Sequence, residues 1–230
     1  MANKMKINSL KSKAISFTRK RNKIIASYTL GGEAIPEVNK CKYLGITFSS
    51  DLGWGEHVTN TAGKAWRALH FVMRVLRKGS GKSKEIAYKS LVRPVMEYGS
   101  ACWDPYRLDH IKTLEKIQKR ALKRCNNSTV KWDTLTDRRT RILLCAMFKT
   151  YRGEPAWREI KNRMQPPNYS SRNDHPHKLR ERRQRTDTGK FSFLNRTIRD
   201  WNALPADLLK ALPITKNVLK NRLKNLTNRR

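Results

Sequence analysis

The chain has 230 residues, of which 51 are Lys or Arg and 18 are Asp or Glu, so its formal net charge is +33. This excess of one sign repels itself in a compact state and favours a polyanionic partner, which points to nucleic acid. No apolar run approaches the roughly 18 residues of a membrane span. The four cysteines lack the spacing of a zinc site or a disulfide framework. We therefore expect a reduced, intracellular protein with no bound metal and no membrane segment.

Short strand patterns open the chain. Residues Lys13–Phe17 alternate polar and apolar positions, and Ile24–Leu30 is β-branched and aromatic up to a Gly31-Gly32 turn. Residues Lys40–Trp54 are typical of a strand, a tight glycine turn and a second strand with an aromatic face. Because a few short strands cannot close a core alone, we expect 1–54 to form the edge of a sheet.

Helical spacing follows. Apolar residues recur on one stripe in Glu56–Arg77, and a second helix beginning at Ser83 should be kinked or stopped by Pro94. A third helix, with Asp109 as its expected cap, carries Lys and Arg over most of its polar surface. A fourth is expected over Leu135–Tyr151. The GSGKS stretch between the first two helices resembles part of a P-loop, but the glycine that this pattern requires five positions before Gly81 is Leu76 here. The stretch therefore indicates a loop that links the two helices.

The C-terminal third has a different composition. Residues 165–190 are rich in Pro, Ser, Asn and Arg, which predicts a basic flexible linker, and KLRERRQR from Lys178 suggests an import signal or an RNA-contacting arm. The segment TRKRNK from Thr18 allows the same two interpretations. A last basic amphipathic helix is expected from Thr215. The fold class is therefore α+β, with short antiparallel strands, a mainly helical region and a basic, partly disordered C-terminal extension.

Several short phrases form an ordered series along the chain. Asn8, Lys11 and Ser12 form the pattern NxxKS ahead of Phe17, and YLG begins at Tyr43. Later phrases are AYKSLVRP from Ala87, EYG from Glu97, WDPY from Trp103, LEKIQ from Leu114, FSF from Phe191, RTIR from Arg196 and DWNALP from Asp200. Over nearly its whole length the chain resembles the C-terminal part of a non-LTR (LINE-type, jockey-like) retrotransposon reverse transcriptase.

The resemblance implies an organisation and an activity. It assigns 1–54 to a palm-edge remnant, 55–130 to a helical thumb, 131–164 to a helical extension, 165–190 to the linker and 191–230 to a C-terminal helical segment. The parent enzyme would be an RNA-directed DNA polymerase that uses two magnesium ions on closely placed carboxylates. That family carries them partly in a Tyr/Phe-Ala-Asp-Asp hairpin, whereas no Asp of this chain has an adjacent Asp.

By the family order, the catalytic hairpin would lie upstream of Met1. We therefore expect a fragment with no catalytic residue and no cofactor of its own, which is inactive as a polymerase in isolation. Its expected partners are RNA, RNA–DNA or DNA duplex and the missing N-terminal part of the polymerase, in a nuclear or cytoplasmic ribonucleoprotein. The alternatives are a free-standing, non-catalytic basic nucleic-acid-binding protein and a relic without a stable fold.

The resemblance also implies roles for particular residues. Lys11 would be an auxiliary cation near the incoming triphosphate, or else a solvated lysine beside an edge strand. Tyr43, Leu44 and Gly45 would grip the primer end, or else Tyr43 and Leu44 would be core residues. The basic helix faces would follow the phosphates of a template–primer duplex, although a charge run is ordinarily only a solvated face. The candidates on these faces are Lys64, Arg67, Arg74, Lys116, Lys119, Arg120, Lys123 and Arg124.

Overall fold

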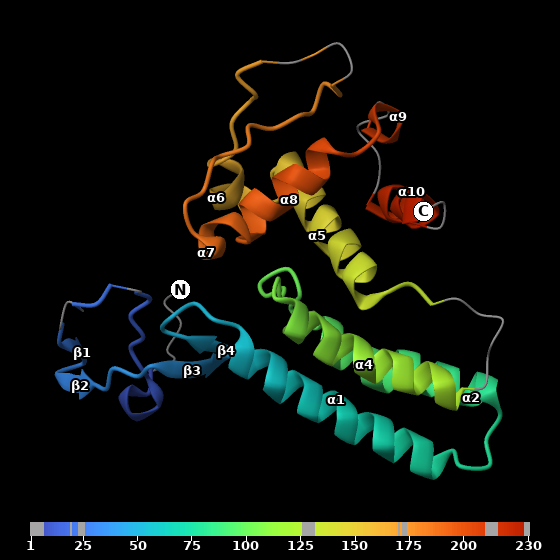
Figure 1. Ribbon diagram of the computed structural model, residues 1–230. Coiled ribbons are helices and arrows are strands. Elements are labelled where there is room, and N and C mark those ends of the chain that lie inside the picture. The colour runs from blue at the N-terminus through green and yellow to red at the C-terminus, as the bar shows by residue number, and fades with distance from the viewer. Residues whose placement is uncertain are drawn as a thin grey trace, which may run out of the picture. The chain divides into compact units, whose positions relative to one another are not determined.

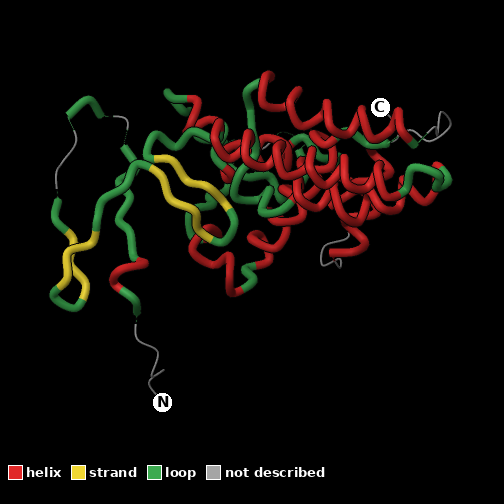
Figure 2. Tube along the Cα trace, turned by 90° about the horizontal axis from the view of Figure 1, so that it is seen from below, coloured by secondary structure: helices red, strands yellow, loops and turns green. Residues whose placement is uncertain are grey.

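The computed structural model describes residues 7–18, 20–22, 26–125, 132–169, 171, 174–209 and 216–227. The chain divides into two compact units, Met1–Thr61 and Ala62–Arg230. Short antiparallel strand pairs and a larger set of helices confirm the α+β class (Figure 2). No helix among the described residues is long and apolar enough to cross a membrane. The start of the expected strand at Ile24 and the two ends of the C-terminal tail lie outside the described residues.

Unit 1 contains two separate hairpins (Figure 1). Strand β1 (Tyr28–Leu30) pairs with β2 (Glu33–Ile35), and β3 (Lys40–Tyr43) pairs with β4 (Ile46–Ser49). Both pairs are antiparallel, as the sequence predicted. A short 3₁₀ turn, η1 (Ser9–Lys11), precedes them.

The hairpin loops explain the glycines of this region. Each loop has two residues, Gly31-Gly32 and Leu44-Gly45, and all four have positive φ. Two-residue loops of this hand match the right-handed twist of the flanking strands. The strand expected over Lys13–Phe17 is absent, since only an isolated bridge between Ala14 and Glu37 forms there. A strand needs several consecutive bridges to a partner, and this segment has one. The strand predicted from its alternating pattern is therefore wrong.

A chain of rings anchors the second hairpin within unit 1. Phe48 lies 6.3 Å from Phe17 and 6.0 Å from Trp54, and Trp54 lies 6.2 Å from His57, measured between ring centroids. His57 is buried, and its Nδ1 accepts a hydrogen bond of 3.1 Å from the backbone N–H of Thr47. The aromatic face predicted for Lys40–Trp54 is therefore the packed side of the hairpin.

Unit 2 begins within the longest helix and continues through a kinked helical segment. The elements in order are α1 (Gly55–Val75), α2 (Gly81–Ala87), the π-helical turn η2 (Tyr88–Val92), α3 (Arg93–Glu97) and α4 (Leu108–Arg124). The kink expected at Pro94 is confirmed, because the backbone N–H of Arg93 reaches back to the carbonyl of Tyr88 in a π turn. Proline has no N–H to donate within a helix, and the π turn places Pro94 at the start of a new helical segment, where that donor is not needed.

The structure corrects the cap predicted for α4 and adds detail to the GSGKS stretch at the start of α2. The cap of α4 is Arg107, and Asp109 lies in the first turn, where its charge favours the helix dipole and its carboxylate accepts hydrogen bonds from Arg107. In the GSGKS stretch, Ser80 caps α2. A Cβ on Gly81 would lie 2.1 Å from the carbonyl oxygen of Cys125, so this glycine permits close approach of the end of α4.

The C-terminal part of unit 2 is built around α5 (Leu135–Arg152). Thr134 caps this helix by accepting a hydrogen bond from the backbone of Asp137, and Gly153 ends it with a φ of 73°. Helices α8 (Phe193–Asn202) and α10 (Lys216–Thr227) pack against α5. The shorter elements are η3 (Pro155–Trp157), α6 (Arg158–Lys161), α7 (Asp187–Lys190) and α9 (Ala206–Leu209).

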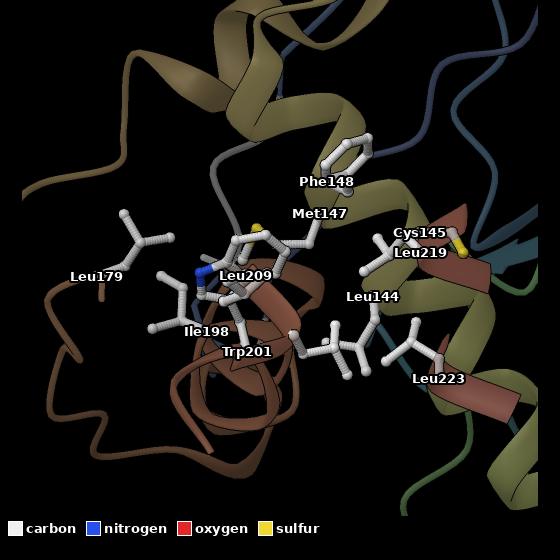
Figure 3. Packing of buried hydrophobic residues seen from close by; sticks show 11 residues of the cluster. Leu144, Cys145, Met147, Phe148, Leu179, Ile198, Trp201, Leu209, Leu219 and Leu223 are labelled. Carbon is white, nitrogen blue, oxygen red and sulfur yellow. The ribbon is translucent and has the colours of Figure 1, made fainter. Parts of the chain in front are cut away.

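One hydrophobic cluster joins these helices (Figure 3). Its fully buried members include Phe148 of α5 and Trp201 of α8. Leu179 belongs to the cluster although composition placed it in a flexible linker. The side chain of Asn202 holds the backbone of Leu179 from both sides, at 2.9 Å to its N–H and 2.8 Å to its carbonyl. Part of the expected linker is therefore packed. His175 is also buried there, and the His177 carbonyl accepts a hydrogen bond of 2.9 Å from the indole of Trp201.

Candidate nucleic-acid interface

Helix α4 separates an apolar face from a basic one. Leu114, Ile117 and Ala121 are buried. The basic residues predicted to bind nucleic acid on this helix are all exposed, and they are Lys116, Lys119, Arg120, Lys123 and Arg124. At 3.6 residues per turn these positions fall away from the buried stripe, so the sequence period fixes which charges face solvent.

A groove runs between α1 and α4, which lie side by side (Figure 1). Its volume is about 600 Å³. Helix α1 contributes Trp66 and His70, and α4 contributes the four cations Lys116, Lys119, Arg120 and Lys123. Among the described residues that line it, none carries a carboxylate. The structure thus gathers half of the predicted phosphate contacts beside an aromatic pair. The exposed lining is almost wholly apolar, so the α4 side chains line the groove mainly with their aliphatic stems and carry their charges at its rim.

The aromatic wall depends on helical spacing. Trp66 and His70 are one turn apart on α1, and their ring centroids lie 5.6 Å from each other at an interplanar angle of 44°. Trp66 is half-buried and His70 is exposed. The core positions of the same stretch of α1 are Ala65, Leu69 and Val72. Trp66 therefore borders the core and presents part of its ring to the groove.

The cationic wall is electrostatically uncompensated. Within the described part of the chain, none of Lys116, Lys119, Arg120 and Lys123 forms an ion pair. A cluster of cations that outnumber the neighbouring acids creates a positive potential that concentrates anions. This wall is suited to phosphates, since lysine and arginine supply charge-assisted hydrogen bonds to phosphate oxygens.

The remaining basic candidates lie elsewhere on the two helices. Lys64, Arg67 and Arg74 are exposed on α1 but are not among the residues that line the groove. Arg124 is exposed in the last turn of α4 and also lies outside the lining. The predicted basic surface is therefore divided, and only its α4 part faces the groove.

The NxxKS pattern forms a local capped turn in unit 1. The Asn8 side chain accepts a hydrogen bond of 3.1 Å from the backbone N–H of Lys11, and the Ser12 hydroxyl donates to the Asn8 carbonyl at 2.9 Å. Asn8 and Ser12 thus shape η1, as short polar side chains commonly do at turns. The side chain of Lys11 is exposed.

The YLG phrase occupies the tip of the β3–β4 hairpin. Tyr43 is 65% exposed and Leu44 is 69% exposed, so the core alternative for these two residues is wrong. Leu44 has a φ of 46° and precedes Gly45 with a φ of 83°. A leucine in this left-handed region costs about 1 kcal/mol. The two-residue loop therefore holds an apolar side chain outward at the tip of the hairpin.

A buried ionic cluster was missed by sequence reasoning. Asp104 lies in the loop before α4, and its carboxylate is within 3.1 Å of Arg139 of α5 and 2.8 Å of Arg196 of α8. The guanidinium of Arg139 also lies 4.1 Å from the ring centroid of Trp103. Burial lowers the pKa of Arg139, and the Asp104 carboxylate opposes that shift. The phrases WDPY and RTIR thus contribute the two partners of one ion pair, Asp104 and Arg196, which connects separate segments of unit 2.

Comparison with known proteins gives two related sequences from Drosophila melanogaster. The chain is 34% identical over 115 residues to the probable RNA-directed DNA polymerase from transposon X-element, which covers 49% of this chain and 13% of that protein. It is 25% identical over 123 residues to the probable RNA-directed DNA polymerase from transposon BS, covering 52% and 14%. No protein-family profile and no solved structure matches the chain. About half of the chain is therefore a region related to transposon reverse transcriptases.

Proposed function

We propose that this chain is a C-terminal part of a non-LTR, jockey-like retrotransposon reverse transcriptase, and that its contribution to that enzyme is to bind nucleic acid. The two similar proteins are both named as transposon RNA-directed DNA polymerases. The ordered phrases from Asn8 to Pro205 support the finer assignment to the thumb and the C-terminal extension. The chain spans 13% and 14% of these relatives, so the activity of the whole enzyme is part of the proposal.

The unpaired cations of the α1–α4 groove are the observation that carries the binding proposal. Lys116 and Lys123 bound this wall, and at 1.5 Å per residue they are about 10 Å apart along the helix. That length matches about three phosphates of one strand, at 3.4 Å per step. The wall is thus long enough to contact successive phosphates of a template–primer duplex of RNA and DNA.

The catalytic step belongs to residues outside this chain. Two-metal polymerisation needs closely placed carboxylates, which the family carries partly in an Asp-Asp pair, and no two Asp residues are adjacent here. Among the described residues, no cluster of three or more potential metal ligands occurs. Magnesium and the Asp pair would be supplied by the N-terminal part of the polymerase, which is also the proposed partner of unit 1. The exposed apolar side chains of unit 1, among them Leu10, Phe17 and Tyr28, support such a contact.

Salt dependence tests the binding proposal. The logarithm of the association constant for an RNA–DNA duplex should fall linearly with the logarithm of salt concentration. Replacing Lys116 and Lys123 by Gln should weaken binding and reduce the magnitude of that slope by about 2, one for each lost phosphate contact. Lys161→Gln is the matched control, because Lys161 is an exposed lysine that neither lines the groove nor belongs to the predicted phosphate contacts. A flat salt dependence in the unmodified chain would refute the proposal.

Primer extension tests the division of labour. The purified chain with magnesium, nucleotides and an RNA-templated primer should give no extension above background. Extension by the chain alone, abolished by chelation of the metal, would show that the catalytic carboxylates are present in this segment.

A further inference from the structure

We infer that the α1–α4 groove binds a single strand of nucleic acid, with one unpaired base stacked against Trp66 and His70 and the neighbouring phosphates on the α4 cations. The inference rests on the proposed function, since it names the form of nucleic acid that this groove selects. It arises from the pairing of two walls, one aromatic and one cationic, across a space of about 600 Å³.

The aromatic wall has no evident use in binding a duplex. The faces of bases inside a duplex are stacked on one another, so a protein contacts its phosphates, sugars and groove edges. An unpaired base exposes its π-face, and aromatic side chains bind such faces with little preference for sequence. Trp66 and His70 line the same groove as the α4 cations that would hold the phosphates of the same strand.

The rings are also open to receive a base. Within the described residues, His70 is the only ring that Trp66 contacts, and the two rings are tilted by 44° instead of being stacked face to face. His70 is exposed, so packing of the core does not explain its position. The buried positions Ala65, Leu69 and Val72 already supply the apolar face of this part of α1.

The size and charge of the groove agree with this ligand. Pockets for small ligands commonly measure about 300 to 1,000 Å³, and this groove lies inside that range. Its four cations have no ion-pair partner among the described residues, so approaching phosphates need not displace a carboxylate. A strand can therefore lie along α4 with a base turned toward α1.

The test compares single-stranded RNA, single-stranded DNA and an RNA–DNA duplex of equal length, each bound to the full chain and followed by fluorescence anisotropy. Trp66→Leu should weaken single-strand binding about tenfold, because one stacking contact is lost, and should leave duplex binding within twofold. Trp66→Phe keeps an aromatic face and should retain most of the affinity. Comparing RNA with DNA of the same sequence shows whether the sugar contributes.

Tryptophan emission gives a second readout that does not depend on affinity. Single-strand binding should quench emission of the unmodified chain, and this part of the quenching should be absent in Trp66→Phe. If Trp66→Leu weakens single strand and duplex equally, or weakens neither, the inference is wrong while the proposed function stands. If the unmodified chain binds neither form in a salt-dependent way, the proposed function itself fails.

Discussion

Asp104 and Arg196 form a buried ion pair of 2.8 Å, and the same carboxylate receives a hydrogen bond of 3.1 Å from Arg139. Asp104 belongs to the loop before α4, whereas the two arginines belong to α8 and α5. One carboxylate therefore joins three separate segments of unit 2. Arg139 is buried and Arg196 is mostly shielded from water, so the cluster is sensitive to the loss of the carboxylate that contacts them both.

Replacing Asp104 by Asn should destabilise the protein by about 3 kcal/mol, because Arg139 and Arg196 lose the carboxylate that contacts them both. Urea unfolding followed by circular dichroism measures this change. Asp109→Asn is the matched control, since Asp109 is an exposed partner of Arg107. Exposed pairs contribute little, so the control should unfold near the midpoint of the unmodified chain. Equal midpoints for Asp104→Asn and the unmodified chain would contradict a stabilising role for this cluster.

Gly81 and Gly63 should respond in opposite ways to substitution by Ala. The new Cβ at Gly81 would lie 2.1 Å from the carbonyl oxygen of Cys125, so overpacking should cost about 2 kcal/mol. At Gly63, inside α1, the nearest atom is Nη1 of Arg67 at 3.6 Å. Ala there should stabilise the helix by about 0.5 to 1 kcal/mol. Thermal unfolding of both variants measures the contrast, and a loss of stability at both positions would argue against the described helix packing.

Leu44→Asn should stabilise the β3–β4 hairpin by up to about 1 kcal/mol, because Asn tolerates the left-handed region better than Leu. Hydrogen exchange at the backbone amides of Tyr43 and Ile46 reports the change locally. If the hairpin tip grips nucleic acid, the same variant should bind a primed template more weakly, so that stability and binding move in opposite directions. Gly45→Ala, which removes the preferred glycine at a φ of 83°, should instead destabilise the hairpin.

His177 should make stability depend on pH. Burial lowers the pKa of His177 below its usual value, and the charge of His175 lowers it further. Because the folded state then disfavours the proton, stability should be intact above about pH 6.5 and should decline as the pH falls through the lowered pKa. The melting temperature between pH 8 and pH 5 tests this.

His177→Gln isolates the contribution of that imidazole, which lies 2.9 Å from the hydroxyl of Tyr151. The variant should lose less stability on acidification than the unmodified chain. The pH dependence that remains in the variant measures the contribution of all other groups. Identical slopes in the two proteins would exclude His177 as a titrating group.

Much of the fold followed from local patterns. The stripe of Val58, Ala62, Leu69 and Val72 predicted α1, and the paired glycines predicted the first hairpin loop, because helical period and positive φ are properties of neighbouring residues. The strand prediction for Lys13–Phe17 was wrong because it, too, used only local information. An alternating segment becomes a strand only when a distant partner offers a ladder, and here just one bridge forms.

The candidate site shows the same division. The sequence alone determined the basic surface of α4 and the absence of adjacent Asp residues, since both depend only on residue type and spacing. Tertiary structure decided that Trp66 and His70 share a groove with those cations, that Asp104 meets Arg139 and Arg196, and that Leu179 enters the core. These contacts join residues that are far apart along the chain, and local periodicity carries no information on which faces meet when helices pack.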